Sequence, residues 1–138
     1  MRNIFLLFFA YLPLVMCSQK TDNLKDKFAN YFLIGATINQ EDYQIIDKDN
    51  KVLKIVSEDF NSVTPENSMK WMHSHPEYSK FTFSNAQKIT DFAKENDMFL
   101  LGHTLVWHNQ VPKYVSDIKD KIKFDLHIKN HIFQLVTR

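Results

Sequence analysis

The sequence predicts an α/β fold built from parallel βα units. Three short apolar runs, at residues 32–38, 60–64 and 98–101, have the length of buried strands. Segments with helical spacing of apolar residues follow each run, and this alternation favours a parallel sheet with right-handed crossovers. With 138 residues, 44% of them hydrophobic, the chain has the composition of at most one ordinary globular domain.

Residues 1–17 have the pattern of an export signal, with the basic Arg2 followed by an apolar stretch. That stretch is shorter than the roughly 20 residues a membrane helix needs. Cys17, the only cysteine, ends the segment in an order resembling the lipobox of bacterial lipoprotein precursors, although Met16 replaces the usual small residue. We therefore expect an exported protein that is periplasmic, anchored to the outer membrane through Cys17, or extracellular after ordinary cleavage. A single cysteine allows no intramolecular disulfide.

The first βα unit follows a polar segment at residues 18–31, which is expected to be a tether or a short leading helix. Residues 32–38 form a near-continuous apolar run, which is typical of a strand buried on both faces. Residues 40–59 have mixed helical spacing interrupted by a turn-like segment at 47–50, so helical segments are expected there.

The second unit has a strand at residues 60–64, which Pro65 is expected to end because proline lacks the N–H that a ladder needs. Ser84 and Gln87 match the S-x-x-Q capping box, which predicts that a helix begins at Ser84. Residues 96–97 are expected to end this helix before the third strand.

The third unit ends in a helix expected within residues 117–137. Its apolar face consists of Ile118, Ile122, Leu126, Phe133 and Val136. Three such units leave two open sheet edges and one uncovered sheet face. We expect that further chain is missing, that the protein self-associates, or that it folds poorly.

Polar and aromatic side chains gather directly after the second and third strands, at residues 64–71 and 102–112. The carboxyl ends of parallel strands meet at one edge, where ligands of α/β folds bind. The second segment places aromatic, imidazole and amide groups where an apolar run breaks off. This combination is typical of a sugar-binding surface.

Three motifs resemble one family of enzymes. They are N-S-V-T-P-E-N at residues 61–67, M-K-W at 69–71, and G-H-T-L-V-W-H at 102–108, followed by Gln110. Together they resemble glycoside hydrolase family 10, the endo-β-1,4-xylanases, and the resemblance covers about residues 32–138. It implies a (β/α)8 TIM barrel, of which this chain has the first three βα units. It also implies hydrolysis of xylan or xylo-oligosaccharides with retention of configuration and no cofactor or metal.

The resemblance implies that Glu66, Asn67 and Lys70 line the glycone side of a cleft and bind sugar hydroxyls. An alternative for Glu66 and Lys70 is an i,i+4 surface ion pair, which contributes only about 0.2–0.5 kcal/mol.

On the other segment, the resemblance implies that His103 binds a hydroxyl, that Trp107 is an apolar plate beside the sugar nearest the scissile bond, and that Gln110 adds an amide contact. Trp71 is expected to pack behind these residues. His108 is open between a supporting role and packing.

Retaining hydrolysis requires two carboxyl groups roughly 5–5.5 Å apart. In the resembled family these glutamates follow the fourth strand and lie in the seventh, and neither region is in these 138 residues. Glu66 alone cannot act as both acid and nucleophile. We expect a truncated chain that lacks the C-terminal part of the barrel and is inactive alone. The alternatives are a non-catalytic carbohydrate-binding or surface remnant and a purely structural fragment.

Other classes of function have little support in the sequence. A net charge of +1 gives no electrostatic case for nucleic acid. His127 and His131 have a spacing that can bind metal, but Ile128 stands where the H-E-x-x-H motif has glutamate, so a structural role is expected. His73 and His75 are expected in a solvated loop.

Overall fold

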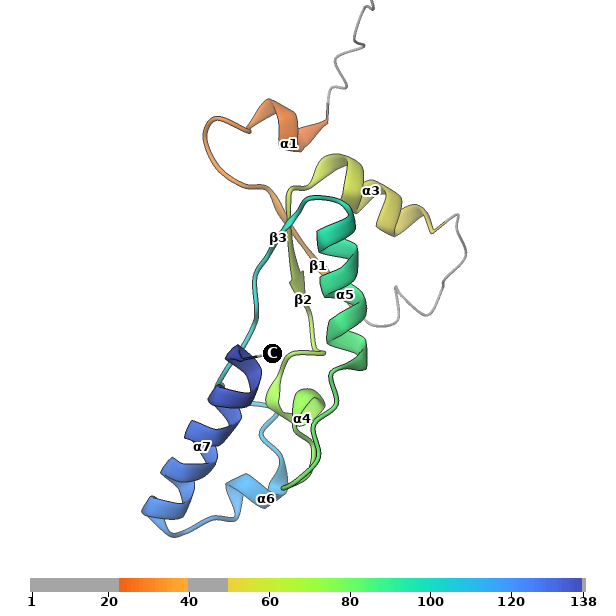
Figure 1. Ribbon diagram of the computed structural model, residues 1–138. Helices are drawn as coiled ribbons and strands as arrows, with labels where there is room; N and C mark the ends of the chain where they lie inside the picture. Colours follow the sequence, from red (N-terminus) through yellow and green to blue (C-terminus); the bar gives the residue numbers. More distant parts are fainter. Residues whose placement is uncertain (1–22, 40–49, 138) are drawn as a thin grey trace, which may run out of the picture.

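A computed structural model describes residues 23–39 and 50–137 (Figure 1). The predictions for the export signal, Cys17 and residues 40–49 lie outside the described residues. In chain order the elements are α1 (Leu24–Lys27), β1 (Gly35–Ile38), α3 (Lys51–Asp59), β2 (Ser62–Pro65), α4 (Trp71–Ser74), α5 (Ser84–Glu95), β3 (Phe99–Leu100), α6 (Lys113–Ser116) and α7 (Lys121–Val136).

The three strands form one parallel sheet in the order β1-β2-β3, as the alternating pattern predicted. Gly35 pairs with Ser62, which in turn pairs with Phe99. Pro65 takes part in the ladder opposite Ile38, at the last position of β2. The chain therefore has the architecture of consecutive βα units, with the carboxyl ends of all three strands at one edge.

The helices begin and end where local hydrogen bonds dictate. Asn50 caps α3, since its side-chain oxygen accepts from the backbone N–H groups of Val52 at 3.0 Å and Leu53 at 3.3 Å. Asp120 caps α7 by accepting from the N–H of Lys123 at 2.9 Å. These side chains satisfy donors that have no partner within the helix.

The predicted capping box at Ser84 is wrong, although α5 does begin at that residue. The N-cap is Phe83, whose carbonyl accepts from the N–H of Gln87 at 2.7 Å. Ser84 is thus already one residue inside the helix, past the cap position. The Gln87 side chain points along the helix instead and donates to Asp91 at 2.8 Å. The predicted end is confirmed, because the helix stops at Glu95.

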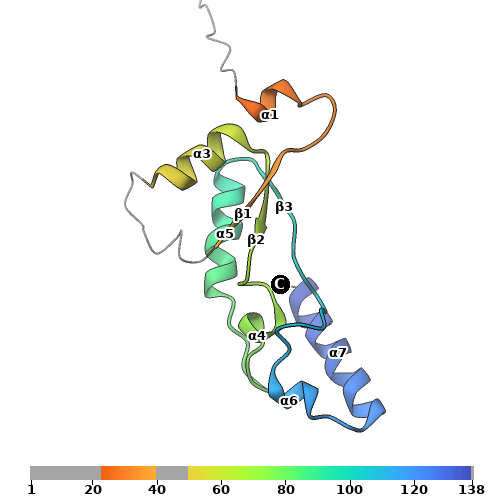
Figure 2. The same ribbon diagram turned by 180° about the vertical axis from the view of Figure 1, so that it is seen from behind.

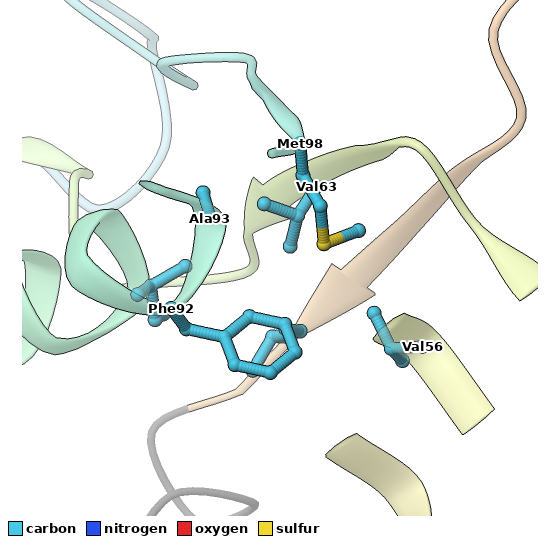
Figure 3. Close-up of a cluster of buried hydrophobic side chains, with 7 residues drawn as sticks. Val56, Val63, Phe92, Ala93 and Met98 are labelled. Carbon is cyan, nitrogen blue, oxygen red and sulfur yellow. The ribbon is translucent and has the colours of Figure 1, made fainter. Parts of the chain in front are cut away.

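A cluster of buried apolar side chains joins α3 and α5 to the sheet (Figure 3). The close-up shows Val63 of β2 facing Ala93 and Phe92 of α5, with Met98 and Val56 completing the cluster. The buried members are Ile38, Val56, Val63, Ile89, Phe92, Ala93 and Met98. Apolar burial of this kind is the main force holding the units together.

The prediction that the first strand is buried on both faces is wrong. The apolar run around β3 is also buried on one face only. Only Ile38 of β1 is buried. Beside β3, Phe99 is 56% and Leu101 53% exposed, whereas Met98 is 8% exposed. Because α3 and α5 pack on one face, the side chains that alternate to the other face remain uncovered.

The last helix, α7, packs beyond the carboxyl ends of the strands. Seen from behind, α5 lies along one side of the strands, and the segment after β3 descends on the other side to α6 and α7 (Figure 2). The only buried side chain of α7 is His131, while Ile122 and Phe133 of the predicted apolar face are 74% and 60% exposed. In the part of the chain that the structure describes, no helix is long and apolar enough to cross a membrane.

Candidate functional site

The candidate site lies at the edge formed by the carboxyl ends of β2 and β3. Two segments emerge there, residues 66–70 and 102–110, which together are called the rim. The N–H of Glu66 still bonds the carbonyl of Ile38 at 2.9 Å, so the first rim segment starts in line with the sheet. The six residues predicted to bind substrate all lie on these two segments.

Four of the predicted residues are in contact with one another. Lys70 donates from Nζ to Oδ1 of Asn67 at 2.9 Å, and the same ammonium lies 5.1 Å from the centre of the Trp107 ring. Gln110 donates from Nε2 to the same oxygen of Asn67 at 3.4 Å. A cation over a tryptophan face contributes about 0.5–2 kcal/mol, depending on how well water is excluded. The two rim segments are therefore joined side chain to side chain.

Rings from the second segment stand beside this polar group. The His103 and Trp107 rings have centroids 6.3 Å apart at an angle of 53°, and His108 meets Trp107 edge-on at 5.5 Å. Both histidines are exposed and Trp107 is half-buried. Aromatic surface with a few placed polar groups is the usual composition of a small-molecule site.

Glu66 lies apart from this polar group, and its side chain is exposed. Residues 66–70 form a turn rather than a helix, so the geometry of an i,i+4 helical pair between Glu66 and Lys70 does not arise. The Lys70 ammonium bonds Asn67 instead.

Gln110 is held by α4 at two points. Its backbone has a φ of 53°, a value uncommon for residues other than glycine, and its carbonyl accepts from the N–H of Met72 at 2.9 Å. Its side-chain oxygen lies 3.2 Å from Nε2 of His73. His73 is exposed, as expected, but no pattern in the sequence predicts this contact, because the two residues are 37 positions apart.

Behind the rim lies a layer of stacked rings. Trp71 is 3% exposed, which confirms that it packs behind the rim. Its ring lies parallel to His131 at 4.0 Å, and its indole N–H donates to the hydroxyl of Tyr114 at 3.1 Å. This layer supports the backbone from which Lys70 projects.

The prediction that His75 is solvated is wrong, because its ring is fully buried. The ring of His75 stacks on Phe81 with the centroids 3.9 Å apart. Its Nε2 lies 3.1 Å from the carbonyl oxygen of Tyr78, and its Nδ1 lies 3.3 Å from Nδ1 of His131. The loop that holds His75 folds back under the rim, where α7 covers it.

Burial lowers the pKa of His131 to about 4, helped by the neighbouring His75 and partly opposed by the backbone of Leu105. Burial likewise lowers the pKa of His75, with the carbonyl of Tyr78 opposing and His127 adding to the effect. Both rings are therefore neutral near pH 7, which fits a structural role. Within residues 23–39 and 50–137, no three side chains among His, Cys, Asp and Glu are grouped to hold a metal ion.

Comparison with known proteins agrees with this architecture. The sequence model of Glycosyl hydrolase family 10 matches residues 23–138. The chain is 41% identical over 115 residues to "Beta-1,4-xylanase" of Dictyoglomus thermophilum, covering 83% of this chain and 30% of the relative. It is 42% identical over 93 residues to "Endo-1,4-beta-xylanase A" of Caldicellulosiruptor saccharolyticus, covering 67% of this chain and 26% of the relative.

Among solved structures, xylanase 10B of Thermotoga petrophila in complex with xylobiose superposes with a TM-score of 0.73 at 32% identity. The match covers 83% of this chain and 35% of that structure. The chain thus spans about a third of the length of the proteins it matches. The sheet of three parallel strands is the corresponding portion of their TIM barrels.

Proposed function

Because the chain belongs to glycosyl hydrolase family 10, we propose that residues 32–138 form the xylan-binding N-terminal part of a retaining endo-1,4-β-xylanase barrel. The observation that carries this proposal is the contact between the two rim segments through Asn67, Lys70 and Gln110, beside the Trp107 ring. Xylan chains are neutral and rich in hydroxyls, so they suit a site of amide, ammonium and aromatic groups.

On the first rim segment, we assign Glu66, Asn67 and Lys70 to the hydroxyls of the glycone sugars. Lys70 and Glu66 carry charges, and hydrogen bonds to charged groups are stronger than those between neutral groups. The exposed carboxylate of Glu66 is accessible to a sugar at the cleft.

On the second segment, we assign His103 to a hydroxyl of the sugar nearest the scissile bond and Trp107 to its apolar face. Gln110 contacts a sugar farther along the cleft. The Thermotoga petrophila relative was solved in complex with xylobiose, which supports a xylo-oligosaccharide as the ligand of this chain.

Catalysis would need two carboxyl groups roughly 5–5.5 Å apart, one as acid/base and one as nucleophile. The family resemblance assigns them to a position after the fourth strand and to the seventh, whereas the described residues form three strands. We therefore propose that residues 1–138 taken alone do not hydrolyse xylan, and that the activity belongs to a barrel in which the remaining βα units are present.

A second candidate is a carbohydrate-binding remnant without catalysis. One observation favours it: Lys70, Asn67, Gln110 and Trp107 are already in contact within the described residues. A one-sided site buries little of a sugar, so its binding should be weak.

Titration of the 138-residue chain with xylotriose, followed by NMR, tests the binding proposal. We expect shifts of the Trp107 indole and of the Gln110 side-chain amide, and loss of those shifts in Trp107→Ala. Tyr78→Ala is the matched control, because Tyr78 is an exposed aromatic residue that contacts His127 and not the rim. Wild-type spectra unchanged at millimolar xylotriose would exclude the binding proposal.

A reducing-sugar assay on xylan tests the catalytic part separately. We expect no product from the 138-residue chain, and product when a polypeptide carrying the remaining family βα units is supplied. Turnover by the chain alone would contradict the assignment of both carboxyl groups to other segments.

We further propose that residues 1–17 direct export and that Cys17 is the site of lipid attachment, with an ordinary cleaved signal as the alternative. The support is the basic and apolar order of the segment and the position of the single cysteine at its end. Incorporation of labelled fatty acid that disappears in Cys17→Ser is the expected result, and labelling that persists in this variant would remove Cys17 from the proposal.

A further inference from the structure

The hydrogen bonds at the rim form a chain with one direction, and that direction is set by Lys70. An ammonium group can only donate, so the atom of Asn67 at 2.9 Å from Nζ must be its oxygen. The same oxygen lies 3.4 Å from the amide of Gln110, which must therefore present its nitrogen. The oxygen of the Gln110 amide then faces Nε2 of His73 at 3.2 Å.

An amide oxygen only accepts, so Nε2 of His73 must carry a proton and donate it. We propose that His73 is a positioning residue that holds the amide of Gln110 in one orientation, so that its N–H supports the orientation of Asn67 that Lys70 sets. In that orientation Oδ1 of Asn67 is held by Lys70 and Gln110, and its Nδ2 donors remain available for the ligand. The identity of that ligand as a xylo-oligosaccharide rests on the proposed function.

His73 is well placed for this role because α4 holds Gln110 through the backbone as well. The N–H of Met72 donates to the carbonyl of Gln110 at 2.9 Å, next to the side-chain contact from His73. The α4 segment is itself fixed, since Thr82 donates from its hydroxyl to the carbonyl of His73 and from its N–H to that of Ser74. These bonds fix the backbone from which the His73 ring projects.

The orientation of the Asn67 amide decides which sugar atoms can bind. Ring and glycosidic oxygens only accept, and a hydroxyl can accept as well as donate. An amide that presents its nitrogen therefore suits an acceptor, while a reversed amide would present an oxygen. Without the donor at His73, the Gln110 amide can turn away from Asn67, and Oδ1 of Asn67 would then be held by Lys70 alone.

The ring of His73 provides a direct test that needs no substitution. In the wild-type chain, long-range proton–nitrogen correlation spectra should show Nε2 of His73 protonated. An unprotonated Nε2 with the proton on Nδ1 would overturn the inference, because His73 could then not donate to the oxygen of Gln110.

Two variants test the action on Gln110 and Asn67. His73→Phe keeps a planar ring but has no donor, and His73→Gln keeps an N–H donor at similar reach. We expect His73→Phe to move the side-chain amide chemical shifts of Gln110 toward those of a free glutamine and to weaken xylotriose binding roughly tenfold, the factor of one lost hydrogen bond. His73→Gln should restore both within about twofold of wild type.

The outcomes separate this inference from the proposed function. Unchanged amide signals and unchanged affinity in His73→Phe would overturn the positioning role while leaving xylan binding in place. If wild type binds no xylotriose, the proposed function fails, and the ring and amide signals still decide whether His73 orders Gln110.

Discussion

His131 is the residue through which the last helix supports the rim. It is the one buried side chain of α7, and it stacks on Trp71, the residue next to Lys70. Its Nδ1 faces that of His75 at 3.3 Å, while its Nε2 has no hydrogen bond of ordinary geometry. A buried imidazole with an unsatisfied nitrogen is costly, and protonating it beside a second imidazole costs more.

This environment predicts that stability falls in acid. The pKa of His131 is about 4 in the folded chain and near 6.5, the ordinary value for histidine, in the unfolded chain. Between these values unfolding takes up a proton, so the free energy of unfolding decreases as the pH falls, by at most about 1.4 kcal/mol per pH unit for this group. Urea denaturation at several pH values from 7 to 4 measures the effect. Above pH 6.5 the contribution should be constant.

His131→Phe is the control, since it keeps a ring against Trp71 and removes the titrating group. The decline between pH 6.5 and 4 should then be shallower, although His75, whose pKa is also lowered, still contributes. The same slope in wild type and variant would rule out His131 as its source.

At the scale of elements, α7 depends on its first turn more than on its apolar face. Four of the apolar residues predicted to form that face, Ile122, Leu126, Phe133 and Val136, are 59% exposed or more. The hydrogen bond from the N–H of Lys123 to the Asp120 side chain therefore contributes a larger part of the stability of α7. Its carboxylate also lies near the positive end of the helix dipole.

Asp120→Ala removes the acceptor for the N–H of Lys123 and should lower the free energy of unfolding by about 1 kcal/mol. Asp120→Ser retains a side-chain oxygen at the cap and should lose only a fraction of that amount. Urea denaturation monitored by circular dichroism at pH 7 measures both. Equal losses in the two variants would mean that the cap bond contributes nothing.

The elements were predicted in the right order, and their ends were predicted unevenly. Asn96 and Asp97 end α5 as expected, because this stop depends on residues adjacent in sequence. The predicted N-cap of α5 was wrong, because Phe83 occupies that position without a side-chain hydrogen bond. A phenylalanine at this position is not a recognisable capping signal in the sequence. β3 is also shorter than its apolar run, because its length depends on its pairing partner in β2.

For the whole molecule, the main feature is apolar surface left open beside a small core. Phe99 and Leu101 are exposed at β3, and Leu126 and Phe133 are exposed on α7. A hollow of about 300 Å³ also separates α5 from α7 beside β3. Surfaces of this kind bind another apolar surface or cause association.

We expect the 138-residue chain to self-associate at micromolar concentration. The double variant Leu126→Glu with Phe133→Glu should increase the monomer fraction in sedimentation velocity, because it places charges on the exposed α7 face. Lys121→Glu is the matched control, since it makes the same change in net charge at an exposed position of α7. At roughly 100° per residue, this position lies about 120–140° around the helix axis from Leu126 and Phe133. A wild-type chain that is monomeric and melts cooperatively would contradict the expectation that the exposed apolar surfaces cause self-association.

The sequence by itself determined the order of strands and helices, the parallel sheet and the family, because these follow from periodicity and from motifs whose residues are adjacent in the chain. It also placed Asn67, Lys70, Trp107 and Gln110 on two segments at one edge of the sheet. Their roles in binding xylan stay predictions.

Only the tertiary structure decided which surfaces are covered and which distant groups meet. It buried His75 under α7, left one face of the strands exposed and brought His73 to Gln110. The physical reason is the same in each case. Burial and hydrogen-bond partners depend on what packs against a side chain, and here the packing partners come from segments far away in the sequence.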